Sequence, residues 1–253
     1  MTQQLGSHGA RKALIIFMKF PDEGRIKTRL SREIGHKAAL RLYQKLLRRA
    51  LGVASDFKHT YEDTDLFVFY SPPDKRIPTM NSYPGPWEFA PQVNGHLGEK
   101  MRAAFVEVFG KGYRQIVLIG TDIADIMVSD IRDAFQALSE RKTVLGPALD
   151  GGFYLIGLCA VFDEIFDFSS WSNARVFQRT LKCFHTGGLE AVTIEQRKDI
   201  DHKKDLGCLR EDTMFHDQIS IIIPFLNETK NLACLINSLE MQLWPGDETV
   251  SYT

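Results

Sequence analysis

Short continuous apolar runs alternate with stretches of helical periodicity, and this alternation constrains the fold more than any other feature of the sequence. The apolar runs are residues 13–18, 65–70, 115–119, 143–146 and 153–158. Such runs are typical of strands buried on both faces of a mostly parallel sheet. Amphipathic patterns between them, at 36–57, 101–109 and 131–138, indicate covering helices. The sequence therefore predicts an α/β fold, with three α/β/α layers around a mostly parallel central sheet.

Size and composition suit one large α/β domain with an appendage. The chain has 253 residues, of which 44% are hydrophobic and 25% charged. Apolar runs stay well short of the roughly 18 residues that cross a bilayer, and we identify no secretory signal. The four cysteines are scattered without a C-x-x-C pair, which favours reduced thiols and a cytoplasmic protein.

The predicted domain organisation has three parts. Residues 1–12 are polar and are expected to be a disordered lead-in. Residues 13–212 form the main domain, and 213–253 comprise a linker followed by one strand pattern and one helix pattern. Because one strand and one helix cannot build a core of their own, we expect this last part to be the truncated start of a second domain.

Charge is distributed unevenly along the chain. Between Arg11 and Lys58 there are 13 Lys or Arg and 4 Asp or Glu, a local charge of +9; since the whole chain carries −1, the remainder carries −10. This asymmetry suits a site that holds an anion on one side and a metal on the other. A solvated basic helix face is the alternative. Nucleic-acid binding is not favoured, because the basic stretch lacks interleaved aromatics and a known motif.

A loop with closely spaced cations follows the first predicted strand. Pro21 and Gly24 break the strand, and Arg25, Lys27 and Arg29 follow just before a helical pattern. Arginine offers a bidentate fork and lysine a mobile point charge, so the loop is a candidate phosphate clamp. Ordinary surface basicity explains it equally well. The loop matches neither the P-loop nor the dinucleotide-binding fingerprint.

Acidic residues follow two of the later strands. Asp122 comes directly after the strand at 115–119, where open α/β sheets bind their ligands. Asp150-Gly151-Gly152 separates two apolar strands, which indicates a hairpin turn and leaves a further role open. Asp201 precedes a short helical pattern and is either an N-cap or a metal ligand. Ser129 is the expected N-cap of the helix at 131–138.

Five collinear motifs across about 190 residues carry a family resemblance. They are F-x-K-x-P-x-x-G-x-x-K-T-R-L from Phe17, L-G-E-K-M from Leu97, I-G-T-D-x-x-D from Ile119, L-G-P-x-x-D-G-G-F-Y-L-I-G-L from Leu145, and D-x-D-x-x-x-D-L from Asp199. With these motifs, residues 13–206 resemble a bacterial family of nucleotide-diphospho-sugar transferase-like proteins with the GT-A fold. The family is also labelled glycosyltransferase A-like, DUF2064-type, or radical-SAM/selenodomain-associated transferase 1. The tail from Ile219 resembles the opening of a family 2 glycosyltransferase.

The resemblance implies a nucleoside diphosphate bound at the carboxyl ends of the strands, with a divalent cation, Mg²⁺ or Mn²⁺. The implied metal ligands are Asp122, Asp201 and Asp125. The residues implied to bind substrate and phosphate are Lys19, Arg25, Lys27, Thr28, Arg29, Gly151 and Gly152. The candidates for a catalytic base are Asp150 and Glu99. Ala124 and His202 depart from the family pattern, which usually has proline and threonine there, but neither change removes a carboxylate.

The resulting hypothesis is a metal-dependent transferase that uses a nucleotide-activated substrate. Glycosyl transfer from a nucleotide-sugar is the preferred chemistry, following the family label. Nucleotidyl transfer from a nucleoside triphosphate, with release of pyrophosphate, is the alternative, because the same fold hosts both chemistries. The lysine-rich first loop favours this alternative. A non-catalytic nucleotide-binding module is a third reading. The acceptor is not identified by the sequence, and a homodimer is an assembly to be tested.

Overall fold

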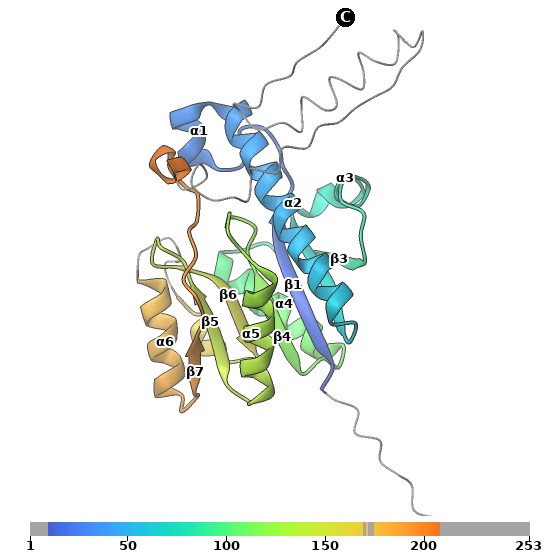
Figure 1. Cartoon of the computed structure of the whole chain (residues 1–253), viewed down its shortest axis with the longest axis vertical. Helices are drawn as coiled ribbons and strands as arrows, with labels where there is room; N and C mark the ends of the chain where they lie inside the picture. The colour runs from blue at the N-terminus through green and yellow to red at the C-terminus, as the bar shows by residue number, and fades with distance from the viewer. Residues whose placement is uncertain (1–9, 169–170, 172–174, 208–253) are drawn as a thin grey trace, which may run out of the picture. The chain divides into compact units, whose positions relative to one another are not determined.

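The computed structural model describes residues 10–168, 171 and 175–207 of the chain. Strands and helices alternate through most of this part (Figure 1). In chain order the elements are β1 (Lys12–Lys19), α1 (Thr28–Ile34), α2 (His36–Thr60), β2 (Thr64–Ser71), η1 (Pro73–Lys75), α3 (Arg76–Ser82), β3 (Trp87–Pro91), α4 (Leu97–Gly110), β4 (Gln115–Ile119), α5 (Val128–Ser139), β5 (Thr143–Pro147), β6 (Phe153–Leu158), η2 (Asp163–Ile165), α6 (Val176–Thr186), β7 (Ala191–Thr193) and η3 (Lys203–Gly207).

Within the described residues, seven strands form a sheet with the order β3-β2-β1-β4-β6-β5-β7. The pairs β3–β2, β2–β1, β1–β4 and β5–β7 are parallel, whereas β6 is antiparallel to both β4 and β5. The central strand β1 is buried at every position from Ala13 to Met18, as its continuous apolar run predicts. The predicted mostly parallel α/β sheet is thus confirmed, and so is the β5–β6 hairpin.

Helices cover both faces of the sheet, which gives the predicted three layers. On one face, Phe105 of α4 and Phe184 of α6 join a core with alternate strand residues such as Ile15 and Ile156. The opposite face is covered by α5, whose Leu138 lies close to the Cα of Gly157 in β6. Figure 1 shows α5 crossing the front of the strands in this view. Because successive residues of a strand point to opposite faces of the sheet, the neighbours of Ile156 and those of Gly157 lie on opposite faces.

The chain divides into two compact units. The first unit comprises Met1–Phe20 and Leu47–Asp199, and the second comprises Pro21–Leu46 and Ile200–Thr253. All seven strands belong to the first unit. The described part of the second unit contains α1, the beginning of α2 and η3, and Figure 1 shows α1 beside η3. The predicted boundary at 212–213 and the tail from Ile219 lie outside the described residues.

Two local predictions were wrong. The prolines at 72, 73, 78, 84 and 86 predict an irregular stretch after β2, but this stretch contains η1 and α3. Ser129 was expected to cap α5, but the helix already begins at Val128, and Asp130 accepts a hydrogen bond from the backbone N–H of Met127 at 2.9 Å. A carboxylate at the third helical position can satisfy the N-cap amide in this way, so no hydroxyl cap is needed. The sequence also predicts a helix cap at Ser172-Asn173, which lies outside the described residues.

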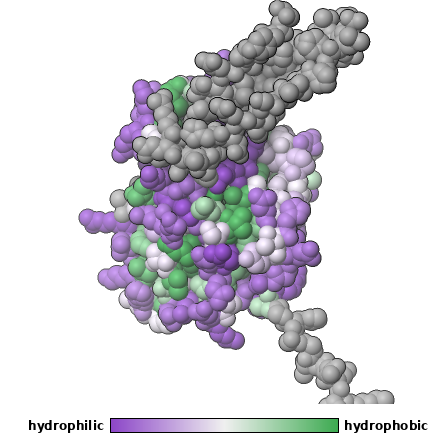
Figure 2. Space-filling model, viewed as in Figure 1, coloured by the Kyte–Doolittle hydropathy of each residue, from purple (hydrophilic) through white to green (hydrophobic). Residues whose placement is uncertain are grey.

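The surface of the described part is mostly polar. In Figure 2, hydrophilic residues frame hydrophobic patches in the middle of the face shown. The large hydrophobic residues that are exposed are Met80, Val93, Leu97, Val106, Met127 and Leu149. Among the described helices, none has the length and apolarity that a membrane crossing requires.

Candidate functional site

The carboxyl ends of the parallel strands define the candidate site of the first unit. Strand β4 ends at Ile119, and Gly120, Thr121 and Asp122 follow it. The amide of Gly120 donates to the carbonyl of Tyr154 at 2.9 Å, and the buried Thr121 hydroxyl donates to the carbonyl of Phe17 at 3.3 Å. These bonds tie the start of the loop to β6 and β1. Asp122 itself is exposed, as the prediction of a ligand-binding carboxylate requires.

A second feature of this edge is a pair of lysines. Lys19 ends β1, and Lys100 lies one turn into α4. Burial lowers the pKa of the Lys100 ammonium, and the positive charge of Lys19 lowers it further. Two like charges that act on each other, close to the positive end of a helix, favour an anion. Lys19 was predicted to bind phosphate, whereas Lys100 was not predicted.

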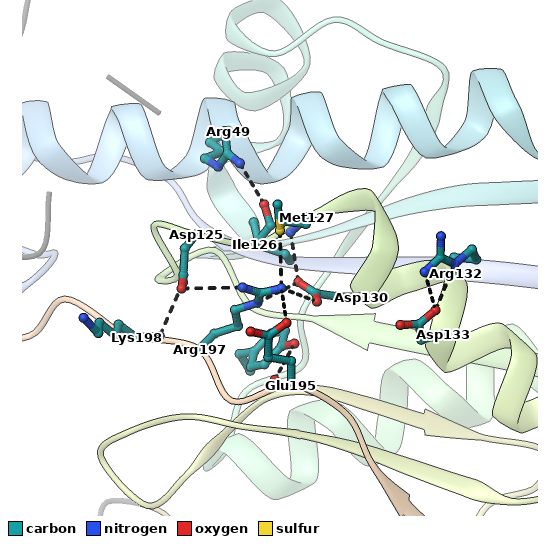
Figure 3. A network of polar contacts seen from close by, with 11 residues as sticks. Arg49, Asp125, Ile126, Met127, Asp130, Arg132, Asp133, Glu195, Arg197 and Lys198 are labelled. Carbon is teal, nitrogen blue, oxygen red and sulfur yellow. Dashed lines mark hydrogen bonds and ion pairs between the residues drawn. The ribbon is translucent and has the colours of Figure 1, made fainter. Parts of the chain in front are cut away.

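A buried arginine forms the centre of a polar network beside the same edge (Figure 3). The Arg197 side chain is 8% exposed and grips Asp130 with two bonds, from Nη2 to Oδ1 at 2.7 Å and from Nε to Oδ2 at 3.1 Å. Its Nη2 also lies 3.2 Å from an oxygen of Glu195. Burial opposes the charged form, but the hydrogen bonds and charge of Asp130, with smaller contributions from Glu195 and Asp125, raise the pKa of Arg197.

Asp125, one of the predicted metal ligands, belongs to this network. One of its oxygens lies 3.8 Å from Nη1 of Arg197, and the other accepts the backbone N–H of Lys198 at 3.3 Å. Arg49 of α2 adds a second positive charge, since its Nη2 donates to the carbonyl of Ile126 at 3.0 Å and its pKa is affected by Asp125. Burial is nevertheless the larger influence, and it lowers the pKa of Arg49. Asp125 therefore has guanidinium groups as neighbours.

The segment around Arg197 also bridges two strand ends. The backbone N–H of Arg197 donates to the carbonyl of Pro147 at 3.0 Å, and its carbonyl accepts the amide of Leu149 at 3.1 Å. Two residues later, Asp199 forms an isolated β-bridge with Ile123. The loops that follow β4 and β5 are therefore fastened by one strap, residues 195–199, which the buried arginine anchors.

The two candidates for a catalytic base have clear local structural roles. Asp150 accepts the backbone N–H of Gly152 at 2.8 Å, and Gly151 adopts a left-handed φ of 88°, so the Asp-Gly-Gly turn shapes the β5–β6 loop. Glu99 caps α4, because its carboxylate accepts the backbone N–H of His96 at 2.8 Å. Both side chains are exposed. A catalytic role for either one stays a prediction.

The second unit contains the predicted cationic loop and Asp201. Oδ1 of Asp201 accepts a bond from the Lys27 ammonium at 3.2 Å, and its Oδ2 accepts one from Nη1 of Arg29 at 3.4 Å. Thr28 is the first residue of α1, and the amide of Arg25 closes a turn on Asp22 at 3.2 Å. Lys27, Arg29 and Asp201 are therefore brought together, and their predicted binding of phosphate and metal stays a prediction.

The predicted metal ligands are divided between the two units, so whether they form one set stays a prediction. Asp122 and Asp125 belong to the first unit and Asp201 to the second, and each unit is described by itself. Within the described residues, no three His, Cys, Asp or Glu side chains form a group that could hold a metal ion. Asp125 and Asp201 instead contact cationic side chains. Asp122 is the predicted carboxylate whose exposure at a strand end suits a metal held jointly with substrate phosphates.

Sequence reasoning missed three participants: Lys100, Arg197 and Asp130. Lys100 stands in the L-G-E-K-M motif, so its position could have been found from the motif itself. The partners Arg197 and Asp130 are 67 residues apart, and neither stands in a recognised motif. No local pattern in the sequence indicates their pairing.

Comparisons with known proteins agree with this architecture. Residues 58–173 match the family described as "Uncharacterized protein conserved in bacteria (DUF2064)". A crystal structure from Desulfovibrio desulfuricans G20, proposed there to be a nucleotide-diphospho-sugar transferase, is 28% identical with a TM-score of 0.74, and the match covers 92% of this chain and 97% of that one.

A second solved structure, 4-diphosphocytidyl-2C-methyl-D-erythritol synthase from Anaerococcus prevotii DSM 20548, shares the fold. It is 8% identical with a TM-score of 0.50, and the match covers 79% of this chain and 99% of that one. No curated protein matches the sequence. The resemblance of residues 13–206 inferred from the motifs is confirmed, since residues 58–173 match the DUF2064 family and the fold is of the nucleotide-diphospho-sugar transferase type.

Proposed function

We propose that the protein is a transferase that acts on a nucleotide-activated substrate, and that it transfers a glycosyl group from a nucleotide-sugar. The observation that carries this proposal is the carboxyl edge of the parallel sheet, where Lys19 ends β1 and Asp122 follows β4. Open α/β sheets bind ligands at this edge. The 28% identical protein proposed to be a nucleotide-diphospho-sugar transferase supports the same substrate class.

The lysines and the strap at this edge have different roles in the proposed reaction. Lys19 and Lys100 neutralise phosphate charge, which makes a nucleoside diphosphate a better leaving group. Lys100 suits this task because burial and the charge of Lys19 lower its pKa, and a bound anion would favour its charged form. The strap that Arg197 anchors keeps the loops after β4 and β5 in position before the substrate arrives. Substrate binding then costs less conformational entropy of these loops.

A divalent cation, Mg²⁺ or Mn²⁺, is part of the proposal through Asp122. Magnesium is commonly held by one or two carboxylates together with substrate phosphates, so one exposed strand-end aspartate suffices on the protein side. When bound, such an ion stabilises the charge that develops on the leaving diphosphate. Asp122 lies on a loop whose first residues, Gly120 and Thr121, are held by hydrogen bonds to β6 and β1.

The test compares products. Purified full-length protein would be offered UDP-, GDP- and CMP-sugars with Mn²⁺ and assayed for free nucleotide, and nucleoside triphosphates would be offered in parallel and assayed for pyrophosphate. Release of nucleoside diphosphate that is lost in Asp122→Asn supports glycosyl transfer. Asp133→Asn is the matched control, because Asp133 is exposed on α5 and pairs with its neighbour Arg132.

Three other outcomes have distinct meanings. Pyrophosphate release from a nucleoside triphosphate would replace glycosyl transfer by nucleotidyl transfer, the chemistry that the cations of the first loop favour. Turnover that persists in Asp122→Asn would remove Asp122 from the mechanism. Nucleotide binding without turnover of any activated substrate would contradict the enzymatic proposal and support a binding module.

A further inference from the structure

Gln92 is a buried polar residue at the carboxyl edge of the sheet, and the proposed reaction leaves it without a role. It follows β3 directly, and its backbone N–H donates to the carbonyl of Tyr70 in β2 at 2.8 Å. Gln92 is only 6% exposed. Its side-chain nitrogen Nε2 donates to the carbonyls of Met18 at 3.2 Å and Phe69 at 2.9 Å. The amide group therefore lies at the carboxyl ends of β1 and β2.

The two carbonyl partners determine which way this amide points. A glutamine amide has two N–H donors on its nitrogen and one acceptor oxygen. Because both neighbours are carbonyl oxygens, the NH₂ group must face them, and both of its hydrogens are used. Among the described residues, none donates a hydrogen bond to Oε1 of Gln92. This atom is also not one of the polar atoms buried without a partner, as Oε1 of Gln115 is. Oε1 of Gln92 is therefore a fixed acceptor that a ligand can reach.

The contacts with the strands leave this acceptor unexplained. Joining β1 to β2 requires only the two N–H donors of the amide. An amide oxygen in a mostly buried position without a donor costs free energy, because it loses hydration and gains no bond. An N–H group of a ligand would satisfy it, whereas a phosphate oxygen would be repelled by its partial negative charge. The role of Gln92 therefore differs from that of the nearby lysines.

Apolar side chains follow Gln92 in the same loop. Val93 and Leu97 are each 46% exposed. The loop is held at its start by the backbone bond of Gln92 to β2, and at its end by Glu99, which accepts the N–H of His96 at 2.8 Å. Ligand sites commonly combine apolar side chains with a few polar groups in fixed positions. An apolar surface beside one acceptor suits a nucleobase, since its faces are apolar and its edge carries N–H groups.

We propose that Gln92 is a specificity residue, whose Oε1 accepts a hydrogen bond from an N–H group on the base of the nucleotide-activated substrate, with Val93 beside the base. The inference rests on the proposed function, because it assigns one part of the same nucleotide to one end of the sheet edge. Gln92 contacts the base and no reacting atom, so its effect is on affinity for the nucleotide.

The experiment measures binding to the full chain by calorimetry with Mn²⁺. The probes are UDP, CDP, GDP and ADP, with pyrophosphate as the probe that lacks a base. Gln92→Met keeps the length of the side chain and removes its amide. It should weaken the tightest nucleoside diphosphate by about tenfold, the effect of one hydrogen bond, and change pyrophosphate affinity by less than about twofold. Gln115→Met is the matched control, because Gln115 donates to the carbonyl of Leu138 at the amino end of β4, and it should change neither affinity.

Two further measurements guard against a folding defect in Gln92→Met. An analogue of the preferred nucleotide that lacks the edge N–H, such as 2-pyrimidinone in place of cytosine, should bind wild type about tenfold more weakly. In Gln92→Met the same analogue should lose little, because the acceptor is already gone, and a folding defect does not produce this coupling. Val93→Ser changes an exposed residue, so it should keep the fold, weaken the nucleotide and leave pyrophosphate binding unchanged.

Three results would overturn the inference while the proposed transferase activity stands. The first is wild-type affinity for the nucleoside diphosphate in Gln92→Met. The second is an equal loss of nucleotide and pyrophosphate affinity in that variant, which would place its effect on the phosphates. The third is a loss that appears with a nucleotide-sugar and not with the nucleoside diphosphate, which would assign Oε1 to the sugar. A wild-type protein that binds none of the nucleotides would instead contradict the proposed function, and the inference with it.

Discussion

Replacing Asp130 by asparagine tests how strongly the buried network stabilises the first unit. Asp130 is 3% exposed and is held by Arg197 through two bonds of 2.7 and 3.1 Å. Removing one partner of a buried pair costs about 3–5 kcal/mol, because the other charge stays buried and uncompensated. Glu195 and Asp125 remain near Arg197, so we expect the lower end, about 3 kcal/mol. For a chain of this size that corresponds to a fall in Tm of roughly 6–12 °C.

The assay is urea unfolding followed by circular dichroism, with wild type and Asp130→Asn compared at neutral pH. Asp133→Asn on the same helix is the control, since its pair with Arg132 is exposed and should contribute less than about 1 kcal/mol. A double-mutant cycle with Arg197→Met then isolates the coupling between Asp130 and Arg197. If Asp130→Asn costs no more than the exposed control, or if the coupling is below about 0.5 kcal/mol, the reasoning about this network is refuted.

Two other predictions follow from the packing and the polar contacts. In the same denaturant assay, Gly98→Ala should destabilise the protein by roughly 1–3 kcal/mol, because the new Cβ would lie 2.3 Å from the carbonyl oxygen of Phe166. Gly110→Ala in the same helix is the control. Its new Cβ meets nothing within 4 Å, so it should be neutral or slightly stabilising. Burial, followed by the hydrogen bond to Asp65 at 2.6 Å, raises the pKa of Tyr113 to about 12. Since this value exceeds the unfolded one of about 10, the stabilisation is complete below about pH 10 and is lost as the pH rises through about 12. Wild type should therefore lose stability over that window relative to Tyr113→Phe, and a pH-independent difference between them would contradict the assignment.

The elements that the sequence predicted are those with a strong local signal. The run from Ala13 to Met18 is apolar at each position, and only a strand covered on both faces buries it completely. The turn at Asp150-Gly151-Gly152 predicted the β5–β6 hairpin for a similar reason, since turn chemistry acts over a few residues. By contrast, η1 and α3 were missed because the prolines in that stretch were taken as breakers alone.

The sequence predicted where Asp122 and Lys19 lie relative to the strands, because strand ends are visible in it, but it did not predict the pairings of charged residues. The roles of Asp122 and Lys19 in a site stay predictions. The bond between Lys27 and Asp201 joins residues 174 apart. Sequence composition gives the charges of such residues, but their pairing depends on how the chain closes in three dimensions.

The reversed direction of β6 has a consequence for how this edge recognises ligands. Loops that lead from a strand into a helix can swing and close over a substrate. The loop at 148–152 instead returns directly into the sheet, and the Ala148 amide closes its mouth by donating to the carbonyl of Gly152 at 3.0 Å. Because β5 and β6 pair on either side of it, we expect this loop to stay in place when a ligand binds. Its influence on selectivity would then come from the side chains that it presents and not from a closing motion.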